Sequence, residues 1–413
     1  MTEEYIINSR LDTDWYKFTM GQFVFHRYPD IPVKYEFINR TKSVSMTEYV
    51  DEKDIRRELD HIMELKVSTE EMDFLASHKN NEGRPILKDD FLKFFENHDL
   101  PLYKLENIGH TYRLEFPGPW KTAIWWEIPA LAIINELYTR KQMKKMDWMD
   151  KAVNFESGKL KLVLKIAKLY KHRGVRFNDF GTRRRFSRIW HEIIVKSIKR
   201  WLPEQFIGTS NVWLARKCDL KPIGTMAHEL FMAMYGIEYS NENPIIASQK
   251  KVMREWQMEY GPDLLTTLTD TFGTDCFLQN MTKEQILSWK GLRQDSGNPF
   301  VFGEEAIKFY QAHGVDPAEK IIIFSDGLDA ETMIALYSKF SQQINCVFGW
   351  RTNLTNDLSV KPLSLVIKLT EANGNPTVKL SDNIAKAVGE PAEIERAKKL
   401  IGYKNEFNQQ PIY

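Results

Sequence analysis

Three segments between residues 179 and 229 combine glycine with side chains that can bind anions, transfer protons or carry a phosphoryl group. Their sequences are DFGTRRR at 179–185, FIGTSN at 206–211 and PIGTMAHE at 222–229. Glycine lets the backbone turn sharply or approach a ligand, arginine binds carboxylates and phosphates through parallel N–H groups, and histidine exchanges protons near neutral pH. Three such segments in one short stretch of chain predict an active site.

Acidic side chains follow apolar runs farther along the chain. They occur at Asp270, within RQDSG at 293–297 and within SDGLD at 325–329. Carboxylates in such positions suit the hydroxyls of a ligand and a hard, oxygen-liganded cation such as Mg²⁺. The simpler alternative is a helix N-cap, for which aspartate is a preferred residue, and Asp329 before Ala-Glu-Thr fits that alternative.

The elements that must position these residues alternate between strand and helix from residue 176 onward. Strands are expected at 176–179, 206–208, 222–224, 266–270, 291–293, 320–324, 344–348 and 363–369, and helices at 187–201, 211–217, 244–260, 302–313 and 330–340. This alternation predicts a mostly parallel sheet, and about eight such units indicate closure into an α/β barrel. Catalytic groups of such barrels lie at the C-terminal ends of strands, where the sequence places Arg183, Ser210, His228, Asp270, Asp295, Asp326 and Gly349.

The first part of the chain mixes helices and strands without this alternation. The expected elements are a helix at 15–28, a strand at 33–40, a charged helical stretch at 52–78, a strand at 111–116 that ends in a Pro-Gly-Pro turn, and an apolar stretch from 123 that leads into a long basic amphipathic helix ending near 173. We therefore predict an α/β protein with an irregular parallel α/β barrel at 136–374. An N-terminal α+β domain at 1–135, joined by the C-terminal segment 375–413, completes the predicted architecture.

Composition narrows the function classes. The 413 residues are 43% hydrophobic, and 57 basic against 56 acidic residues leave a net charge of +1. Balanced charge argues against nucleic-acid binding, which depends on clustered cations. The N-terminus lacks the pattern of a signal peptide, and the sequence lacks a long uncharged apolar run, so we expect a soluble cytoplasmic protein with no membrane partner. The three cysteines are odd in number and widely spaced, which disfavours disulfides or a zinc site.

Ten motifs, in their order along the chain, resemble the nicotinate phosphoribosyltransferase family. They are LDTDWYKFTMGQ at 11–22, FGTRRR at 180–185, GTSN at 208–211, AHE at 227–229, LTDT at 268–271, LRQDSG at 292–297, FSDGLD at 324–329, FGWRTNLTND at 348–357, VIKLTEANG at 366–374 and KLSD at 379–382. The resemblance implies condensation of nicotinate with phosphoribosyl pyrophosphate, assisted by ATP and Mg²⁺, to give nicotinate mononucleotide for NAD synthesis. It also implies an irregular α/β barrel and a homodimer with shared active sites.

The resemblance makes His228 the residue that ATP phosphorylates. A neutral imidazole is a competent nucleophile near pH 7 when a carboxylate fixes its other nitrogen. Glu229, which follows His228 directly, and Asp295, which is assigned to the ribose, complete the predicted catalytic set. The alternative for His228 is an ordinary histidine whose ring is satisfied by hydrogen bonds.

Five residues are expected around nicotinate. Phe180 would stack on the pyridine ring, and Arg183 and Arg293 would bind anionic groups of the substrates. Ser210 replaces an aspartate of similar nicotinamide-using enzymes, so it would not repel the nicotinate carboxylate. Tyr16 matches a family tyrosine that reaches into the pocket of a neighbouring subunit. Of the three arginines at 183–185, at least one is expected on the surface or in a salt bridge.

The phosphoribosyl group is assigned to the remaining loop residues. They are Asp270, Asp326, Gly327, Gly349, Arg351 and Thr352. A second glycine is common in the family where Arg351 stands, and arginine lacks the backbone freedom of glycine. Arg351 therefore either turns outward, adds a guanidinium to the phosphate or marks an altered phosphate site.

Three other functions fit parts of the sequence. A nicotinamide or quinolinate phosphoribosyltransferase shares the reaction class, although Ser210 disfavours the amide and His228 disfavours the quinolinate enzyme. A nucleic-acid-binding protein could use GTRRR and KQMKKM as a basic surface. An inactive barrel that serves as a scaffold is the third.

Overall fold

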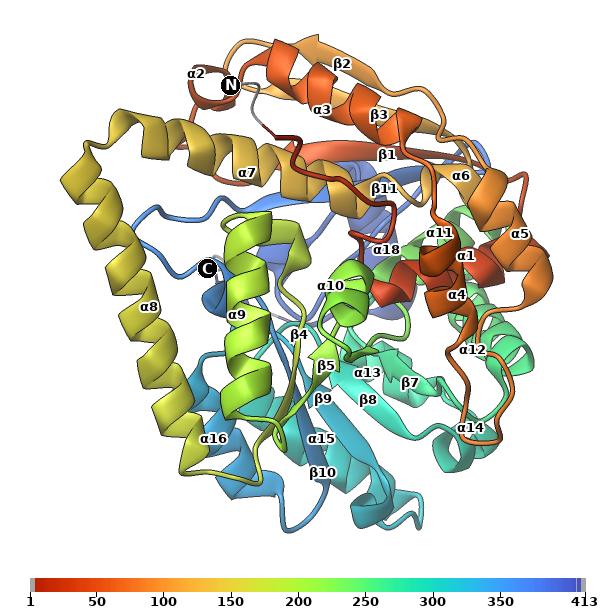
Figure 1. Cartoon of the computed structure of the whole chain (residues 1–413). Coiled ribbons are helices and arrows are strands. Elements are labelled where there is room, and N and C mark those ends of the chain that lie inside the picture. Colours follow the sequence, from red (N-terminus) through yellow and green to blue (C-terminus); the bar gives the residue numbers. More distant parts are fainter. Residues whose placement is uncertain (1–3, 406, 410–413) are drawn as a thin grey trace.

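The computed structural model describes residues 4–405 and 407–409 and contains two sheets. Figure 1 shows the antiparallel sheet at the top of the molecule and the parallel sheet below it, with helices along the outer side of the parallel sheet. The predicted α/β class is therefore confirmed, with a curled parallel sheet in place of a fully closed barrel and a separate antiparallel sheet.

Seven strands form the parallel sheet in the order β6-β5-β4-β10-β9-β8-β7. Their bounds are β4 Arg176–Asp179, β5 Phe206–Thr209, β6 Lys221–Pro222, β7 Thr266–Leu268, β8 Gly291–Gln294, β9 Ile321–Phe324 and β10 Asn345–Trp350. Every neighbouring pair in this sheet runs parallel. The C-terminal ends of the strands consequently meet at one edge, where the motif residues follow.

Helices connect these strands. They are α9 Arg188–Trp201, α10 Val212–Lys217, α11 His228–Ile237, α12 Pro244–Tyr260, α13 Thr274–Gln279, α14 Lys283–Ser288, α15 Pro299–Ala312, α16 Ala330–Phe340 and α17 Thr352–Thr355, with short 3₁₀ turns at Thr182–Arg184 and Pro317–Glu319. The sequence predicts α9, α10, α12, α15 and α16 close to these positions, whereas α11, α13, α14 and α17 were not predicted. Asp329 caps α16, because its carboxylate accepts a hydrogen bond of 2.7 Å from the Thr332 N–H. The N-cap interpretation of Asp329 is thus confirmed.

The antiparallel sheet has the order β12-β11-β1-β3-β2. Its strands are β1 Pro32–Asn39, β2 Lys104–Asn107, β3 Tyr112–Pro119, β11 Leu365–Ala372 and β12 Asn375–Pro376. The other elements outside the parallel sheet are α1 Trp15–Arg27, α2 Met46–Tyr49, α3 Glu52–Glu64, α4 Thr69–Ala76, α5 Asp89–Asn97, α6 Trp120–Ala123, α7 Glu127–Lys145, α8 Trp148–Tyr170, a 3₁₀ turn at Ile384–Lys386 and α18 Pro391–Ile401.

The eighth barrel strand was predicted wrongly. The run expected at 363–369 forms β11, but β11 pairs antiparallel with β1, with Phe37 opposite Ile367 and Tyr35 opposite Leu369. A short apolar run fits either kind of sheet, so its sequence does not identify its partner. The domain division at residues 135 and 374 stays a prediction, although β11, which it assigned to the barrel, lies in the antiparallel sheet.

The predicted Pro-Gly-Pro turn is also wrong, because β3 continues through Pro119. Pro117 and Pro119 pair with β1, opposite Lys34 and Pro32. The other neighbour, β2, pairs only with residues 112–115 of β3. Beyond that point no described strand pairs with this side of β3, and proline is tolerated at such an edge because it has no N–H to donate.

Two long helical segments are each divided in the structure. The stretch expected at 52–78 forms α3 and α4, and Ser68 begins α4 with a capping box. The long basic helix forms α7 and α8, and Asp147 begins α8 by accepting a 2.8 Å hydrogen bond from the Asp150 N–H. Both breaks occur at residues that favour N-cap positions.

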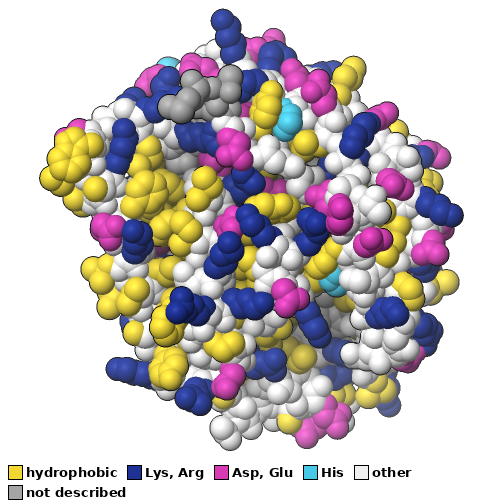
Figure 2. All heavy atoms as spheres, viewed as in Figure 1, with side chains coloured by type: hydrophobic (Ala, Val, Ile, Leu, Met, Phe, Trp, Pro, Cys, Tyr) yellow, Lys and Arg dark blue, Asp and Glu magenta, His cyan; other side chains and the backbone are white. Residues whose placement is uncertain are grey.

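The outer face of α8 is unusually apolar for a surface helix. Figure 2 shows apolar side chains along the left edge of the molecule, where α8 lies in Figure 1. Its exposed apolar residues include Trp148, Val153, Leu160 and Leu164.

Among the described residues, no helix is long and apolar enough to cross a membrane. The three cysteines are unpaired thiols.

Candidate active site

A cavity lies where the C-terminal ends of the parallel strands face the antiparallel sheet. It encloses about 120 Å³ and has one wall of strand-end loops and another wall of residues from β11 and the C-terminal segment. Most of the predicted site residues line it: Tyr16, Phe180, Arg183, Ser210, His228, Glu229, Arg293, Asp295, Asp326, Arg351 and Thr352. Asp270, Gly327 and Gly349 are outside its lining.

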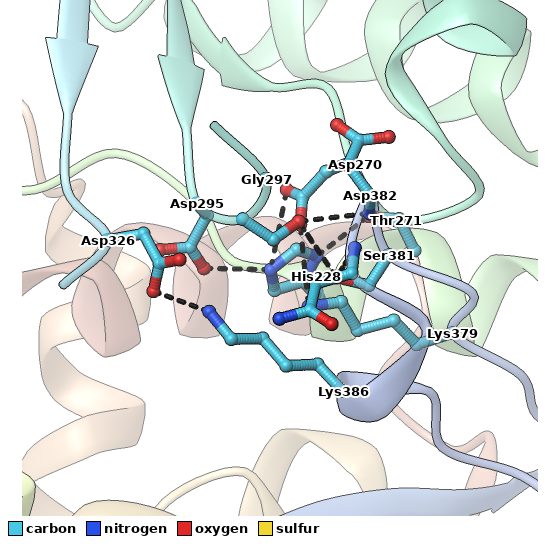
Figure 3. Close-up of polar contacts among 12 residues, drawn as sticks. His228, Asp270, Thr271, Asp295, Gly297, Asp326, Lys379, Ser381, Asp382 and Lys386 are labelled. Carbon is cyan, nitrogen blue, oxygen red and sulfur yellow. Dashed lines mark hydrogen bonds and ion pairs between the residues drawn. The ribbon is translucent and has the colours of Figure 1, made fainter. Parts of the chain in front are cut away.

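The imidazole of His228 lies at the centre of a buried polar cluster. His228 is the first residue of α11, and its Nε2 lies 2.9 Å from Oδ2 of Asp295 and 3.7 Å from Oδ1 of Asp270. Its Nδ1 lies 3.0 Å from the Thr271 hydroxyl. Figure 3 shows Asp270, Thr271 and Asp295 converging on the ring from the ends of β7 and β8. The sequence prediction that strand-end loops meet around His228 is therefore confirmed.

The surroundings of the ring keep His228 neutral. Burial and the nearby Lys379 ammonium lower its pKa to about 4, against the opposing effect of Asp270 and Asp295. Burial alone would raise the pKa of Asp295, but the charge of Arg351, the hydrogen bond with His228 and the charge of Arg293 outweigh burial and hold that pKa well below its usual value. At neutral pH the site therefore combines a neutral imidazole with an ionised carboxylate.

Glu229 does not contact His228. Successive helical residues point about 100° apart, and Glu229 accepts hydrogen bonds from the Tyr35 hydroxyl at 2.5 Å and from the Trp120 indole N–H at 3.0 Å. It also forms a buried ion pair with Lys17. The carboxylate that contacts the ring is Asp295, so the catalytic assignment of Glu229 as a partner of His228 is corrected to a buried network with α1 and β1.

Arg351 turns into the site. Its guanidinium pairs with Asp295 and lies 3.2 Å from the Ser325 hydroxyl, and this hydroxyl lies 3.1 Å from Oδ1 of Asp295. Of the alternatives that the sequence left open, outward orientation is excluded. Arg351 lies directly before α17 and supplies a positive charge to the cavity that a glycine could not provide.

Gly349 has a packing role that the sequence did not reveal. It lies within β10, where a Cβ would come within 2.4 Å of the Phe180 ring and 3.0 Å of the Ser325 side chain. Phe180 also donates its N–H to the Trp350 carbonyl at 2.7 Å. Gly349 thus leaves room for the Phe180 ring, which lines the cavity, to pack against β10.

The three consecutive arginines separate as expected. Arg183 and Arg184 line the cavity, whereas Arg185 is fully buried and binds Asp12 with both nitrogens, at 2.6 and 2.8 Å. Arg183 lies 3.3 Å from Glu127, whose other oxygen lies 2.8 Å from Lys17. The prediction that at least one of the three arginines lies on the surface or in a salt bridge is confirmed by Arg185, which pairs with Asp12 outside the cavity lining.

Tyr16 lines the cavity of its own chain. Its hydroxyl lies 3.4 Å from Oε2 of Glu127, and it shares the cavity wall with Phe180 and Ser210. Within one chain the structure thus brings Tyr16 into the same pocket as His228. The expectation that Tyr16 reaches the pocket of a neighbouring subunit stays a prediction.

Five basic side chains that line the cavity were not predicted from the sequence. Arg40, Arg184, Lys368, Lys379 and Lys386 line the cavity from the antiparallel sheet, the Arg183 segment and the C-terminal segment. Lys379 lies 3.5 Å from Asp270, and Lys386 lies 2.5 Å from Asp326 (Figure 3). Burial, helped by Arg183 and Lys379, lowers the pKa of Lys368 to about 7. Two of these lysines, Lys368 and Lys379, lie in the VIKL and KLSD motifs. The spacing of the motifs did not indicate that the lysine side chains line the cavity.

Comparisons with known proteins cover nearly the whole chain. The nicotinate phosphoribosyltransferase (NAPRTase) family model matches residues 175–409, and the N-terminal domain model of that family matches residues 11–135. A solved nicotinate phosphoribosyltransferase from Porphyromonas gingivalis is 32% identical over 96% of this chain and 100% of its own, with a TM-score of 0.87. A putative one from Saccharomyces cerevisiae is 31% identical over 98% and 100%, with a TM-score of 0.86. One from Vibrio cholerae is 32% identical over 97% and 95%, with a TM-score of 0.87.

Proposed function

The chain belongs to the nicotinate phosphoribosyltransferase family, and we propose that it condenses nicotinate with 5-phosphoribosyl 1-pyrophosphate in a reaction coupled to ATP. The products are nicotinate mononucleotide and pyrophosphate, so the reaction serves NAD synthesis from nicotinate. The observation that carries this proposal is the convergence of Phe180, Arg183, Ser210, His228 and Asp295 on one cavity.

Nicotinate is a planar anion, and one side of the cavity suits it. Phe180 and Tyr16 offer aromatic faces for the pyridine ring, and Arg183 and Arg293 offer guanidinium groups for its carboxylate. Arg293 is fixed by donating to the Met226 carbonyl at 3.0 Å. A serine at 210, in place of a carboxylate, keeps one repulsive charge away from the acid.

Transfer of the ribosyl group needs few protein groups. The pyridine nitrogen attacks C1 of the ribose, the bond from C1 to the pyrophosphate oxygen breaks, and pyrophosphate leaves with the electron pair. Asp295, held ionised, suits ribose hydroxyls and the positive charge that develops on the ring. The cations Lys379, Lys386 and Arg351 suit the charge of the leaving pyrophosphate.

ATP coupling is proposed to proceed through His228. A neutral ring nitrogen attacks the γ-phosphorus of ATP, ADP leaves, and water later hydrolyses the phosphoramidate to restore the imidazole. The lowered pKa supports this role, because the ring keeps its lone pair well below neutral pH. Asp295 and Thr271 hold the ring from its two nitrogens.

Magnesium is proposed to enter with the polyphosphate substrates. Ring and carboxylate ligand atoms of His228, Asp270 and Asp295 lie within 4.8 Å of one another. However, Asp295 already pairs with Arg351 and Asp270 lies near Lys379, so these carboxylates offer little uncompensated charge to a divalent ion. The side chains therefore do not form a built magnesium site of their own.

One assay tests the function. Product formation is measured with nicotinate or nicotinamide, each with and without Mg-ATP, followed by a search for acid-labile phosphate on the protein. We expect nicotinate to be used in preference, ATP to stimulate turnover, and His228→Asn to remove the stimulation and the phosphate while slow ATP-independent transfer continues. His313→Asn is the control, because this exposed ring contacts the carbonyl and the ring of Phe309 and does not line the cavity. Full ATP stimulation in His228→Asn would contradict the proposal.

Two expectations about the enzyme in the cell complete the proposal. A homodimer is expected from the family resemblance, and light scattering of the purified protein in solution measures its mass. A cytoplasmic location is expected from the sequence, and cell fractionation tests it.

A further inference from the structure

The carboxylate of Asp14 lies beside Ser210 in the wall of the proposed nicotinate pocket. Oδ1 of Asp14 is 2.8 Å from the Ser210 hydroxyl oxygen, and both residues line the cavity while each is only 3% exposed. The backbone fixes this contact, because the Trp15 N–H donates to the Ser210 carbonyl at 2.7 Å and Asp14 forms a β-bridge with Asn211. Asp14 precedes α1, yet its side chain makes no capping hydrogen bond.

Two buried carboxylates near Asp14, those of Asp12 and Asp179, each contact a basic side chain, whereas the carboxylate of Asp14 does not. Asp12 binds Arg185 with both oxygens and accepts a further bond from Asn211 at 2.7 Å. Asp179 lies 2.6 Å from Nε2 of His191 and accepts the Thr209 hydroxyl at 2.7 Å. Within the described part of the chain, no Lys, Arg or His nitrogen lies within 4.0 Å of the Asp14 carboxylate. Of the three, only Asp14 lines the cavity.

The protonation of Asp14 decides what Ser210 can offer to a ligand. A serine hydroxyl has one hydrogen. If Asp14 is ionised, that hydrogen points to Asp14, and the pocket presents serine lone pairs and a buried negative charge to the ligand. If Asp14 is protonated, its O–H donates to Ser210, and the Ser210 hydroxyl is then available to donate to a carboxylate in the pocket.

We propose that Asp14 is a further specificity-determining residue, which takes up a proton when nicotinate binds and passes a hydrogen bond through Ser210 to the nicotinate carboxylate. This inference rests on the proposed function, because it assumes that nicotinate occupies the wall at Ser210. The proton comes from solvent and returns to it when the acid leaves, so the cycle balances. Nicotinamide carries no charge and needs no such proton.

The groups that face Asp14 allow this change of charge. Burial raises the pKa of Asp14 and Asp179 adds to that effect, while Arg183 and the Thr182 and Ser210 hydroxyls oppose it. Tyr16, the next but one residue, is a neutral phenol at physiological pH because burial raises its pKa further. An anion placed beside Asp14 raises the pKa of that carboxyl again, since like charges in a buried site disfavour each other.

The test is the pH dependence of kcat/KM for nicotinate in wild type and Asp14→Asn. Asparagine has the same shape, carries no charge and can donate to Ser210 at every pH. In wild type we expect kcat/KM to fall, by up to about tenfold per pH unit, above the pKa that Asp14 has in the unliganded protein. In Asp14→Asn this decline should disappear, so that kcat/KM no longer falls over the pH range in which the wild-type value falls.

Lys368 provides the necessary control, because its pKa of about 7 makes it a second group that can take up a proton when an anion binds. In Lys368→Met, kcat/KM should still fall with rising pH to the extent that ionisation of Asp14 causes the fall. Calorimetry of nicotinate binding in phosphate and in Tris buffer counts the protons directly in wild type and Lys368→Met, so the test does not depend on the folding of Asp14→Asn.

Net proton uptake that survives in Lys368→Met and is lost in Asp14→Asn supports the inference. Absence of uptake in Lys368→Met across pH 6 to 9, or an unchanged decline in Asp14→Asn, overturns it. Failure of the proposed function looks different, because wild type would then form no nicotinate mononucleotide at any pH. An active enzyme without proton uptake refutes the role of Asp14 alone.

Discussion

Nε2 of His228 lies 2.9 Å from Oδ2 of Asp295, although 67 positions separate the two residues in the chain. Asp295 also holds Arg351 and contacts Ser325. The carboxylate of Asp295 therefore holds the proposed nucleophile, His228, and the guanidinium of Arg351 at the same time. We expect Asp295→Ala to lower kcat by roughly 10²- to 10⁴-fold, the range typical of a lost acid–base or orienting group, as measured by steady-state product formation.

Asp329→Ala is the matched control for this prediction. Asp329 follows the next strand, but it caps α16 and does not line the cavity. Loss of the cap should reduce the free energy of unfolding by about 1 kcal/mol, with kcat unchanged. Equal losses of activity in the two variants would show that Asp295 acts through stability alone.

Burial and the Lys379 ammonium together set the acid limit that we expect for the proposed ATP coupling. Both lower the pKa of His228, so Lys379→Met should raise it from about 4 part of the way toward the usual 6.5. Protonation removes the lone pair that attacks ATP. Phosphorylation of the enzyme should therefore persist at pH 5.5 in wild type and decline there in the variant, as measured by acid-labile phosphate formed between pH 5 and 8.

Lys386→Met separates this effect from a general loss of positive charge. Lys386 pairs with Asp326 on the same wall and does not contact His228. Its removal should weaken phosphoribosyl pyrophosphate binding without moving the acid limit. An identical shift in both lysine variants would contradict the assignment to Lys379.

The elements around the site were largely predictable because local signals agree with their tertiary environment. Ser187, Pro244 and Asp329 mark helix starts that the structure reproduces within a few residues. The capping side chains of Ser187 and Asp329 and the fixed φ of Pro244 act on the first turn of the helix. A few neighbouring residues therefore determine where the helix begins. The same holds for the glycine-bearing segments at the ends of β4, β5 and β6.

Pairings over long distances were not predictable from one sequence. β11 joins β1 rather than the parallel sheet, and both environments accept a short apolar strand. Glu229 stands beside His228 in sequence but points to Lys17, 212 positions away. The direction of a helical side chain depends on how the helix packs, and neither residue type nor spacing encodes that packing.

Lys17 is predicted to stabilise the fold rather than to bind substrate. It is fully buried between Glu127 and Glu229, so Lys17→Met leaves the buried carboxylate of Glu229 without its cation and leaves Glu127 with Arg183 alone. Breaking a buried pair in this way should cost about 3–5 kcal/mol in the free energy of unfolding, as measured by urea titration. The double variant Lys17→Met/Glu229→Gln should recover part of this loss. No recovery would indicate that the methionine itself disturbs the packing.

Mixing two impaired variants, and measuring ATP-stimulated activity, tests whether one chain builds the whole site. Tyr16 and His228 line the same cavity of the same chain, so each variant retains its own defect in every pocket it forms. A mixture of Tyr16→Ala and His228→Asn, unfolded and refolded together, should recover no more activity than the two separate samples. If Tyr16 instead entered the pocket of a partner subunit, mixed dimers would contain one pocket with both native residues. Activity in that case would rise with the fraction of mixed dimers, and a refolded wild-type sample shows how much activity survives the procedure.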